Sequence, residues 1–177
     1  MSEILVNRAP FLTLWASVVA GRLGYDADGA LTLGRAVAGQ TAASRGKRLG
    51  ILEERSAEDR RELETRREVL GAETIQFMAR TIPCLRTSRG LRALGETTPI
   101  DPNSVRRYLE SKFKDALPLV EQRLAALALT YPPEELEARA MDLYMRMRPA
   151  VAEGRAGWGQ QGCLDVEAID RLLAERV

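Results

Sequence analysis

The sequence predicts a mostly helical α+β domain, with an N-terminal helical hairpin, a small central antiparallel β meander and a C-terminal helical group. Three observations indicate this class. Apolar residues recur at helical spacing over most of the 177 residues, alternation with period two is confined to residues 74–94, and proline or glycine separates the segments. We expect residues 1–177 to form a single domain, because a chain of this length buries one core without needing disulfides or zinc.

Residues 1–50 predict the helical hairpin. Pro10 suits the first turn of a helix, and the apolar run that follows leaves almost no polar face, which is typical of a buried helix. A short turn comes next. The second helix would begin at a capping aspartate, either Asp26 or Asp28. It would end at a glycine, either Gly46 or Gly50.

Small residues recur every four positions along this second helix, at Ala30, Gly34, Ala38 and Ala42. An internal glycine costs a helix roughly 1 kcal/mol relative to alanine, so the row indicates close approach by another helix. The partner is either the first helix of the hairpin or a second copy of the chain. In the second case the protein would be a homodimer.

Residues 51–72 predict a charged, solvated helix. Ser56 and Asp59 match the capping-box pattern at its start, and Glu62 and Arg66 are spaced to pair across one turn. The segment has little apolar surface to bury. We therefore expect it to lie on the outside of the domain.

Residues 73–95 predict a meander of two or three strands. Apolar and polar side chains alternate from Thr74 to Arg80, Pro83 bends the strand, and residues 88–90 form a turn into a last short strand. This is the only segment with a clear strand period.

Residues 101–149 predict three helices, since each has a proline at an expected first position, namely Pro102, Pro118 and Pro133. Pro149 ends this group. Residues 150–177 then predict a Gly-rich tail and a final short helix capped by Asp165.

The composition excludes the commonest catalytic centres. The chain has 0 histidines, so Ser-His and Cys-His nucleophile pairs and His-ligated metals are absent. Cys84 and Cys163 form neither a C-x-x-C pair nor a zinc spacing, and we expect no metal and no cofactor. A non-catalytic role follows, although an enzyme acting through a Cys84 thiolate beside arginines, or through an acid and arginine pair, stays open.

Nothing in the sequence predicts export or contact with a membrane. Residues 1–7 lack the basic start of a signal peptide, and the apolar stretch 11–20 is too short to cross a bilayer. The expected location is cytoplasmic.

The segment from Gly157 to Gly162 satisfies G-x-G-x-x-G, a spacing that lets backbone amides approach a pyrophosphate at a helix start. The context does not fit, because no strand is predicted before it and Trp158 stands between the first two glycines. We expect instead a tail that wraps the domain and docks Trp158 in an apolar notch.

Two stretches contain arginine or lysine but no acid. Residues 29–52 include Arg45, Lys47 and Arg48, and residues 74–95 include Arg86, Arg89 and Arg92. A helix followed by a basic hairpin is the order of a winged helix-turn-helix, in which the hairpin grips phosphate. The sequence therefore favours a DNA-associated regulatory protein that uses these six residues. The alternative is a protein-interaction module with a homo- or hetero-oligomeric helix contact through the row of small residues.

The stretches that begin at Arg8-Ala-Pro and at Ala30-Leu-Thr-Leu-Gly-Arg, and the Gly157-Trp-Gly tail, resemble a family of uncharacterised bacterial proteins. The resemblance covers nearly the whole chain. It implies a bacterial cytosolic protein built as one unit, and it implies no activity, ligand or catalytic residue.

Overall fold

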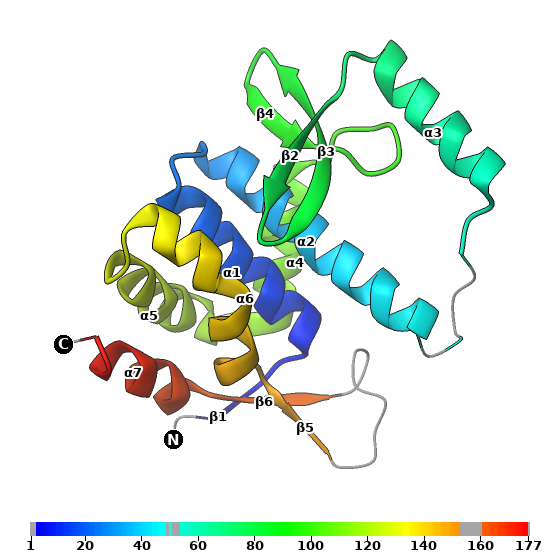
Figure 1. The fold of residues 1–177 in the computed structure, drawn as a ribbon. Helices are drawn as coiled ribbons and strands as arrows, with labels where there is room; N and C mark the ends of the chain where they lie inside the picture. Colours follow the sequence, from blue (N-terminus) through cyan, green and yellow to red (C-terminus); the bar gives the residue numbers. More distant parts are fainter. Residues whose placement is uncertain (1–2, 49, 51–53, 153–160, 177) are drawn as a thin grey trace.

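Helix α1 (Arg8–Arg22) lies at the centre of the fold. The computed structural model describes residues 3–48, 50, 54–152 and 161–176. α1 contacts α2 (Ala27–Arg48), α4 (Pro102–Phe113), α5 (Leu117–Leu129) and α6 (Pro133–Met147), and Figure 1 shows it enclosed by them. Its side chains are buried from Pro10 to Ser17, so the predicted buried helix is confirmed. A helix that is apolar all round can only be stable when neighbours cover every face.

Four helices begin at a capping side chain, and the sequence predicts three of these caps, all but Asp101. Four side chains accept a hydrogen bond from a backbone N–H of the first turn, at 3.0–3.1 Å: Asp26 at α2, Ser56 at α3, Asp101 at α4 and Asp165 at α7. α2 continues without a break from Ala27 to Arg48. The predicted second helix of the hairpin is therefore confirmed. A helix-turn-helix needs a short turn between two short helices, and α2 contains no such turn.

The central meander consists of β2 (Glu73–Phe77), β3 (Arg80–Thr87) and β4 (Gly90–Ala93), paired antiparallel in that order. The three-strand prediction is confirmed, with one correction. The strand expected to run to Arg80 stops at Phe77, because Met78 and Ala79 turn the chain with φ angles of 50° and 62°. Both angles belong to the left-handed region that a two-residue hairpin turn requires.

A second antiparallel sheet joins the two ends of the chain, with strands in the order β1 (Glu3–Leu5), β6 (Gly162–Asp165) and β5 (Ala150–Val151). The sequence prediction placed a tail and loop here, so the sheet corrects it. Gly162 makes the junction possible, because a Cβ at this residue would lie 2.4 Å from the Val6 carbonyl oxygen. The last glycine of the G-x-G-x-x-G motif therefore opens a strand rather than a helix. Residues 157–160 of that motif, which include Trp158, lie outside the described residues.

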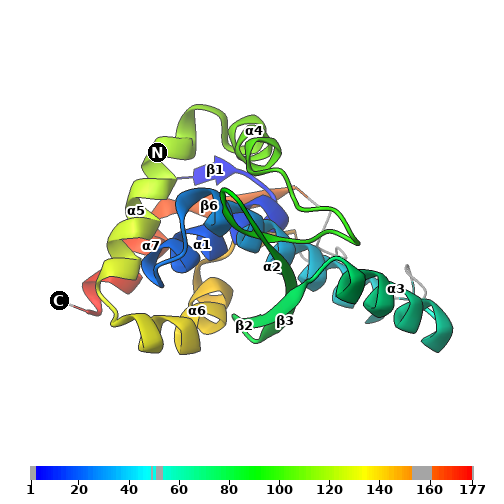
Figure 2. The same cartoon turned by 90° about the horizontal axis from the view of Figure 1, so that it is seen from above.

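The two remaining helices differ in how much they bury. α7 (Val166–Ala174) packs against α5 and α6 and buries Val166, Ile169 and Leu172. α3 (Ala57–Val69) has no buried residue, and Figures 1 and 2 show it projecting beside the meander. The predicted solvated helix is confirmed, including an ion pair of 3.1 Å between Arg66 and Glu62. A short 3₁₀ turn (Lys114–Ala116) links α4 to α5.

Candidate nucleic-acid interface

A groove of about 660 Å³ runs between α2, the meander and α3. Small residues of α2, residues of β3 and of the loop after β4, and three arginines line it. The lining residues that matter below are Arg35, Gln40, Arg55, Arg67, Thr81 and Glu96. Glu96 is the only acid among the described residues that line the groove.

Side-chain hydrogen bonds hold α2 and β3 next to each other. The Gln40 amide donates to the Thr81 carbonyl oxygen at 3.0 Å. The Arg80 guanidinium donates to the hydroxyls of Ser44 and Thr41 at 3.1 and 3.2 Å. The two acid-free stretches of the sequence thus lie side by side along this part of α2.

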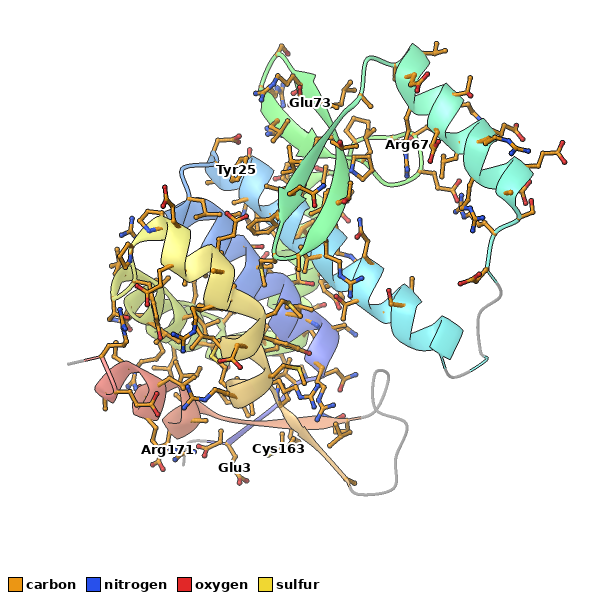
Figure 3. The ribbon with its side chains drawn as sticks, viewed as in Figure 1. Glu3, Tyr25, Arg67, Glu73, Cys163 and Arg171 are labelled. Carbon is orange, nitrogen blue, oxygen red and sulfur yellow. The ribbon has the colours of Figure 1, made fainter. Side chains whose placement is uncertain are left out.

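Arg67 and Arg55 attach α3 to the loop that follows β4. The Arg67 guanidinium donates to the carbonyl oxygens of Glu96 and Gly95 at 2.7 and 2.9 Å, and Figure 3 shows Arg67 on the side of α3 that faces this loop. Arg55 forms an ion pair with the Glu96 carboxylate. Burial, and then the nearby positive charge of Arg55, lower the pKa of Arg67. The charge of Glu96 acts in the opposite direction, so this part of the groove holds two guanidiniums and one carboxylate.

Arg35 reaches the groove from α2. Its guanidinium lies over the Tyr108 ring of α4, 5.2 Å from the ring centre, which orients it without neutralising its charge. Burial raises the pKa of Tyr108, so the ring stays uncharged. Among the described residues no carboxylate forms an ion pair with Arg35.

The three arginines predicted on the meander lie elsewhere. Arg92 is buried, its side chain 7% exposed, and it pairs with Asp26 at 3.1 Å. Arg86 pairs with Glu73 at 3.0 Å, while Arg89 is exposed in the turn before β4. Arg92 thus serves the fold, and a phosphate could reach only the other two.

The predicted basic residues of α2 stand far from that hairpin. The backbone of Arg45, Lys47 and Arg48 belongs to the last turns of α2, whereas their side chains lie outside the described part of the structure. Arg92 contacts Asp26, at the opposite end of the helix. At 1.5 Å per residue the two ends of α2 are roughly 30 Å apart, so the six predicted residues do not form one cluster.

The row of small residues is placed inside the protomer. Ala30, Gly34 and Ala38 are buried, and Ala42 is partly buried. A Cβ at Gly34 would lie 2.2 Å from the Ser17 hydroxyl oxygen of α1. The intramolecular partner that the sequence left open therefore explains this glycine, and a contact between two copies through these residues would require α1 to move.

The two cysteines do not have the properties of nucleophiles. Burial raises the pKa of Cys84 to about 11, and the charge of Glu73 acts in the same direction. The thiol donates to the Ile82 carbonyl oxygen at 3.5 Å. Burial and the charge of Glu3 also raise the pKa of Cys163, which Figure 3 shows on the second sheet.

We expect Cys84 to resist alkylation in the folded protein. A pKa of about 11, against the ordinary thiol value of 9.0, leaves roughly 100-fold less thiolate near pH 8, and burial slows the reaction further. The measurement is the rate of iodoacetamide labelling in a Cys163→Ser variant, which isolates Cys84, with the same variant in denaturant as control. Labelling of folded Cys84 as fast as a free thiol would restore the thiolate hypothesis.

The described residues can also be compared with the requirements of metal sites and membrane-spanning helices. Between residues 3 and 176, apart from the undescribed positions, no group of three Cys, Asp or Glu side chains is arranged to hold a metal ion. In the same residues no helix has the length and apolarity needed to cross a membrane. Comparisons with known protein families, with curated proteins and with solved structures find no match, so any function assigned to this chain rests on its own residues.

Proposed function

We propose that the protein binds DNA through the sugar-phosphate backbone, in the groove between α2, the meander and α3. The observation that carries this proposal is the meeting of Arg35, Arg55 and Arg67 around one groove whose described lining contains a single acid. These arginines come from separate parts of the chain. Guanidinium groups bind phosphate in a planar, bidentate geometry, and phosphate contacts supply most of the affinity of non-specific DNA binding.

The electrostatics of the groove favour an anion. Arg67 and Arg55 bring two positive charges to a place where Glu96 is the one carboxylate of the described lining, so a phosphate there would offset the positive charge that remains. Arg67 uses its Nε and one terminal nitrogen on carbonyl oxygens, which leaves other N–H groups free to donate. A bound phosphate can accept hydrogen bonds from them without disturbing the attachment of α3.

The proposed role is one of binding. Guanidinium groups stay protonated in proteins, so they orient and neutralise phosphate but do not transfer protons. The backbone of Arg45, Lys47 and Arg48 continues α2 beyond Ala43, which lines the groove. We include these three residues in the proposed interface, where they would extend the contact along the DNA. A non-catalytic, DNA-associated regulatory role is the form of this function that the sequence favours.

The test compares two double variants that remove the same charge. Arg35→Gln with Arg55→Gln changes the groove, and Arg86→Gln with Arg89→Gln changes the hairpin; each pair contains one arginine from an exposed ion pair. We expect the groove variant to bind a random duplex at least ~10-fold more weakly at about 50 mM salt, and the slope of log K against log salt to fall by about 1.8, or about 0.9 per phosphate contact. The hairpin variant should keep the slope of the parent protein.

The measurement is fluorescence anisotropy of a labelled duplex at several salt concentrations, with a single strand of the same sequence as a second ligand. Undetectable binding of the parent protein at about 50 mM salt rules out the proposal, because phosphate contacts are strong there. An equal loss in both variants would show a diffuse charge effect in place of a groove. A larger loss of DNA affinity in the hairpin variant would place the binding site at Arg86 and Arg89 instead.

A further inference from the structure

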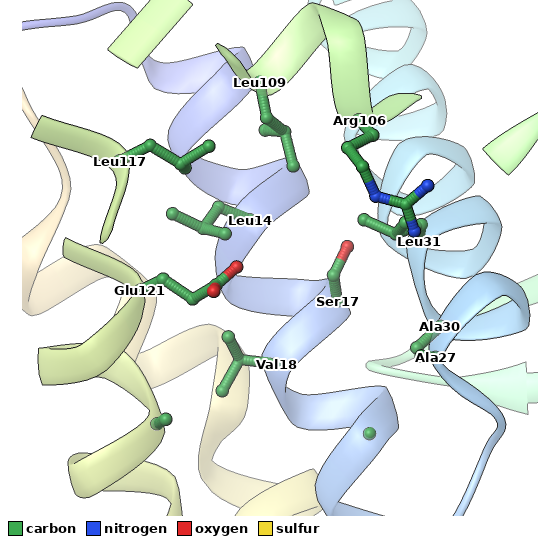
Figure 4. A pocket seen from close by; sticks show the side chains of 12 residues that line it. Leu14, Ser17, Val18, Ala27, Ala30, Leu31, Arg106, Leu109, Leu117 and Glu121 are labelled. Carbon is green, nitrogen blue, oxygen red and sulfur yellow. The ribbon is translucent and has the colours of Figure 1, made fainter. Parts of the chain in front are cut away.

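A second hollow, on the other side of α2 from the groove, opens to solvent and is lined by residues of α1, α2, α4 and α5. It has a volume of about 430 Å³ and a predominantly apolar lining. Figure 4 shows Leu14 and Val18 of α1, Leu31 of α2, and Leu109 and Leu117 around it. The hollow has the size and apolar character of a small-molecule site. Three polar side chains, Ser17, Arg106 and Glu121, complete its wall.

The positive charge at this hollow is already neutralised within the protein. The Arg106 guanidinium donates to the Asp28 carboxylate at 3.1 Å and to the Asn103 side-chain oxygen at 2.9 Å. It closes one side of the hollow between α4 and the start of α2. An anionic ligand would have to compete with Asp28 for this arginine.

The negative charge has no such partner. Glu121 of α5 lines the hollow, and among the described residues no cation forms an ion pair with it. Figure 4 shows its carboxylate directed into the space between α5 and α1, across from the Ser17 hydroxyl. That hydroxyl donates to the Thr13 carbonyl oxygen at 2.7 Å, so its own oxygen can still accept a hydrogen bond. Two acceptors therefore line the hollow, and one of them is charged.

We propose that this hollow binds a small organic cation, a primary ammonium attached to a short alkyl body. The ammonium donates to the Glu121 carboxylate and to the Ser17 oxygen. The alkyl body lies against Leu14, Val18 and Leu117. A charge-assisted hydrogen bond beside apolar surface supplies both the orientation and the affinity of such a ligand. This site is independent of the proposed DNA contact, because the two hollows share no lining residue.

Gly21 provides a way to close the site without damaging the fold. It lines the hollow, and a Cβ built on it would have no other heavy atom within 4 Å. A leucine at this position would extend into the open space that the ligand is proposed to occupy. Replacing a glycine inside a helix also favours the folded state, because glycine has the lower helix propensity.

The experiment is calorimetric titration of the full chain with n-hexylammonium, and with n-hexanoate and n-hexanol as ligands of the same length. We expect saturable binding of the ammonium only. Glu121→Gln should weaken it at least ~10-fold, since the lost hydrogen bond is charge-assisted. Gly21→Leu should abolish it while the melting temperature stays equal or rises. Glu110→Gln, an exposed acid of α4 outside the hollow, is the control and should bind like the parent protein.

Several outcomes would overturn this assignment. Binding of hexanoate or hexanol as tight as that of hexylammonium would remove the role of Glu121. Equal weakening by Glu121→Gln and Glu110→Gln would show a general effect of surface charge. Absence of saturable ammonium binding at millimolar concentration would exclude the site. If Gly21→Leu unfolds the protein, the comparison of the two glutamate variants still decides the question.

Discussion

Gly34→Ala is expected to lower the free energy of unfolding by about 3 kcal/mol, because α1 and α2 approach too closely for a methyl group. A Cβ at Gly34 would lie 2.2 Å from the Ser17 hydroxyl oxygen and 2.4 Å from the Thr13 carbonyl oxygen. The second of these atoms is backbone, so the contact is relieved only if the helices move apart. The core on both sides of the contact would then lose its packing.

Gly39→Ala is the matched control, since Gly39 lies in the same helix. The nearest atom to a Cβ there is the end of the Arg35 side chain at 3.9 Å. We expect this variant to gain up to roughly 1 kcal/mol from the higher helix propensity of alanine. Denaturant unfolding followed by circular dichroism measures both changes. Equal stability of the two variants would mean that α1 and α2 are not held in this close contact.

Much of this fold is predictable because its signals are local. A proline or a capping side chain acts within one turn of its own helix, and so the starts of α2, α4, α6 and α7 follow directly from the sequence. The turn at Met78 and Ala79 was missed, since neither residue is among those that usually adopt positive φ. Met78 is 2% exposed, so burial of its side chain helps to keep it in this conformation.

The second sheet could not be predicted from local signals. β1 and β5 have three and two residues, too few to show a period, and both pair with β6. Leu5 and Cys163 lie opposite each other in this sheet although most of the chain separates them. Such a pairing is specified by the tertiary fold, which brings the chain ends together after the helices have packed.

The arginines that line the groove could not be predicted from local signals either. Counting charges along the chain identifies acid-free stretches, but it does not tell which arginines are consumed inside the fold. Arg92 is buried and paired with Asp26, whereas Arg55 and Arg67 belong to a segment that reads as acidic and solvated. Only the three-dimensional arrangement brings those two arginines to Arg35. Because acids surround Arg67 in the sequence, its segment does not stand out as basic, and its place in the groove is known only from the structure.

Asp26 is expected to contribute more to the free energy of unfolding than an ordinary helix cap, because it also pairs with the buried Arg92. One carboxylate oxygen of Asp26 accepts hydrogen bonds both from the Gly29 N–H at 3.0 Å and from the Arg92 guanidinium at 3.1 Å. Asp28 is the other acid near Arg92, at 3.9 Å. Asp26→Ala removes the cap of α2. It leaves the buried Arg92 with Asp28 as its one carboxylate partner among the described residues, beside the carbonyl oxygens of Leu91 and Arg89. We expect a loss of about 3 kcal/mol, of which about 1 comes from the cap.

Two further substitutions separate these contributions. Asp26→Asn keeps an oxygen that can cap α2 and removes the charge, so it should lose about 2 kcal/mol. Asp101→Ala removes the capping carboxylate of α4, which accepts from the Asn103 N–H, and should lose only about 1 kcal/mol because no buried cation pairs with this carboxylate among the described residues. Denaturant unfolding of the three variants measures the differences. If Asp26→Ala costs no more than Asp101→Ala, Arg92 does not depend on Asp26. The meander would then be held on α2 by its other contacts, such as the hydrogen bond of 3.0 Å from the Ala93 N–H to the Thr32 hydroxyl oxygen.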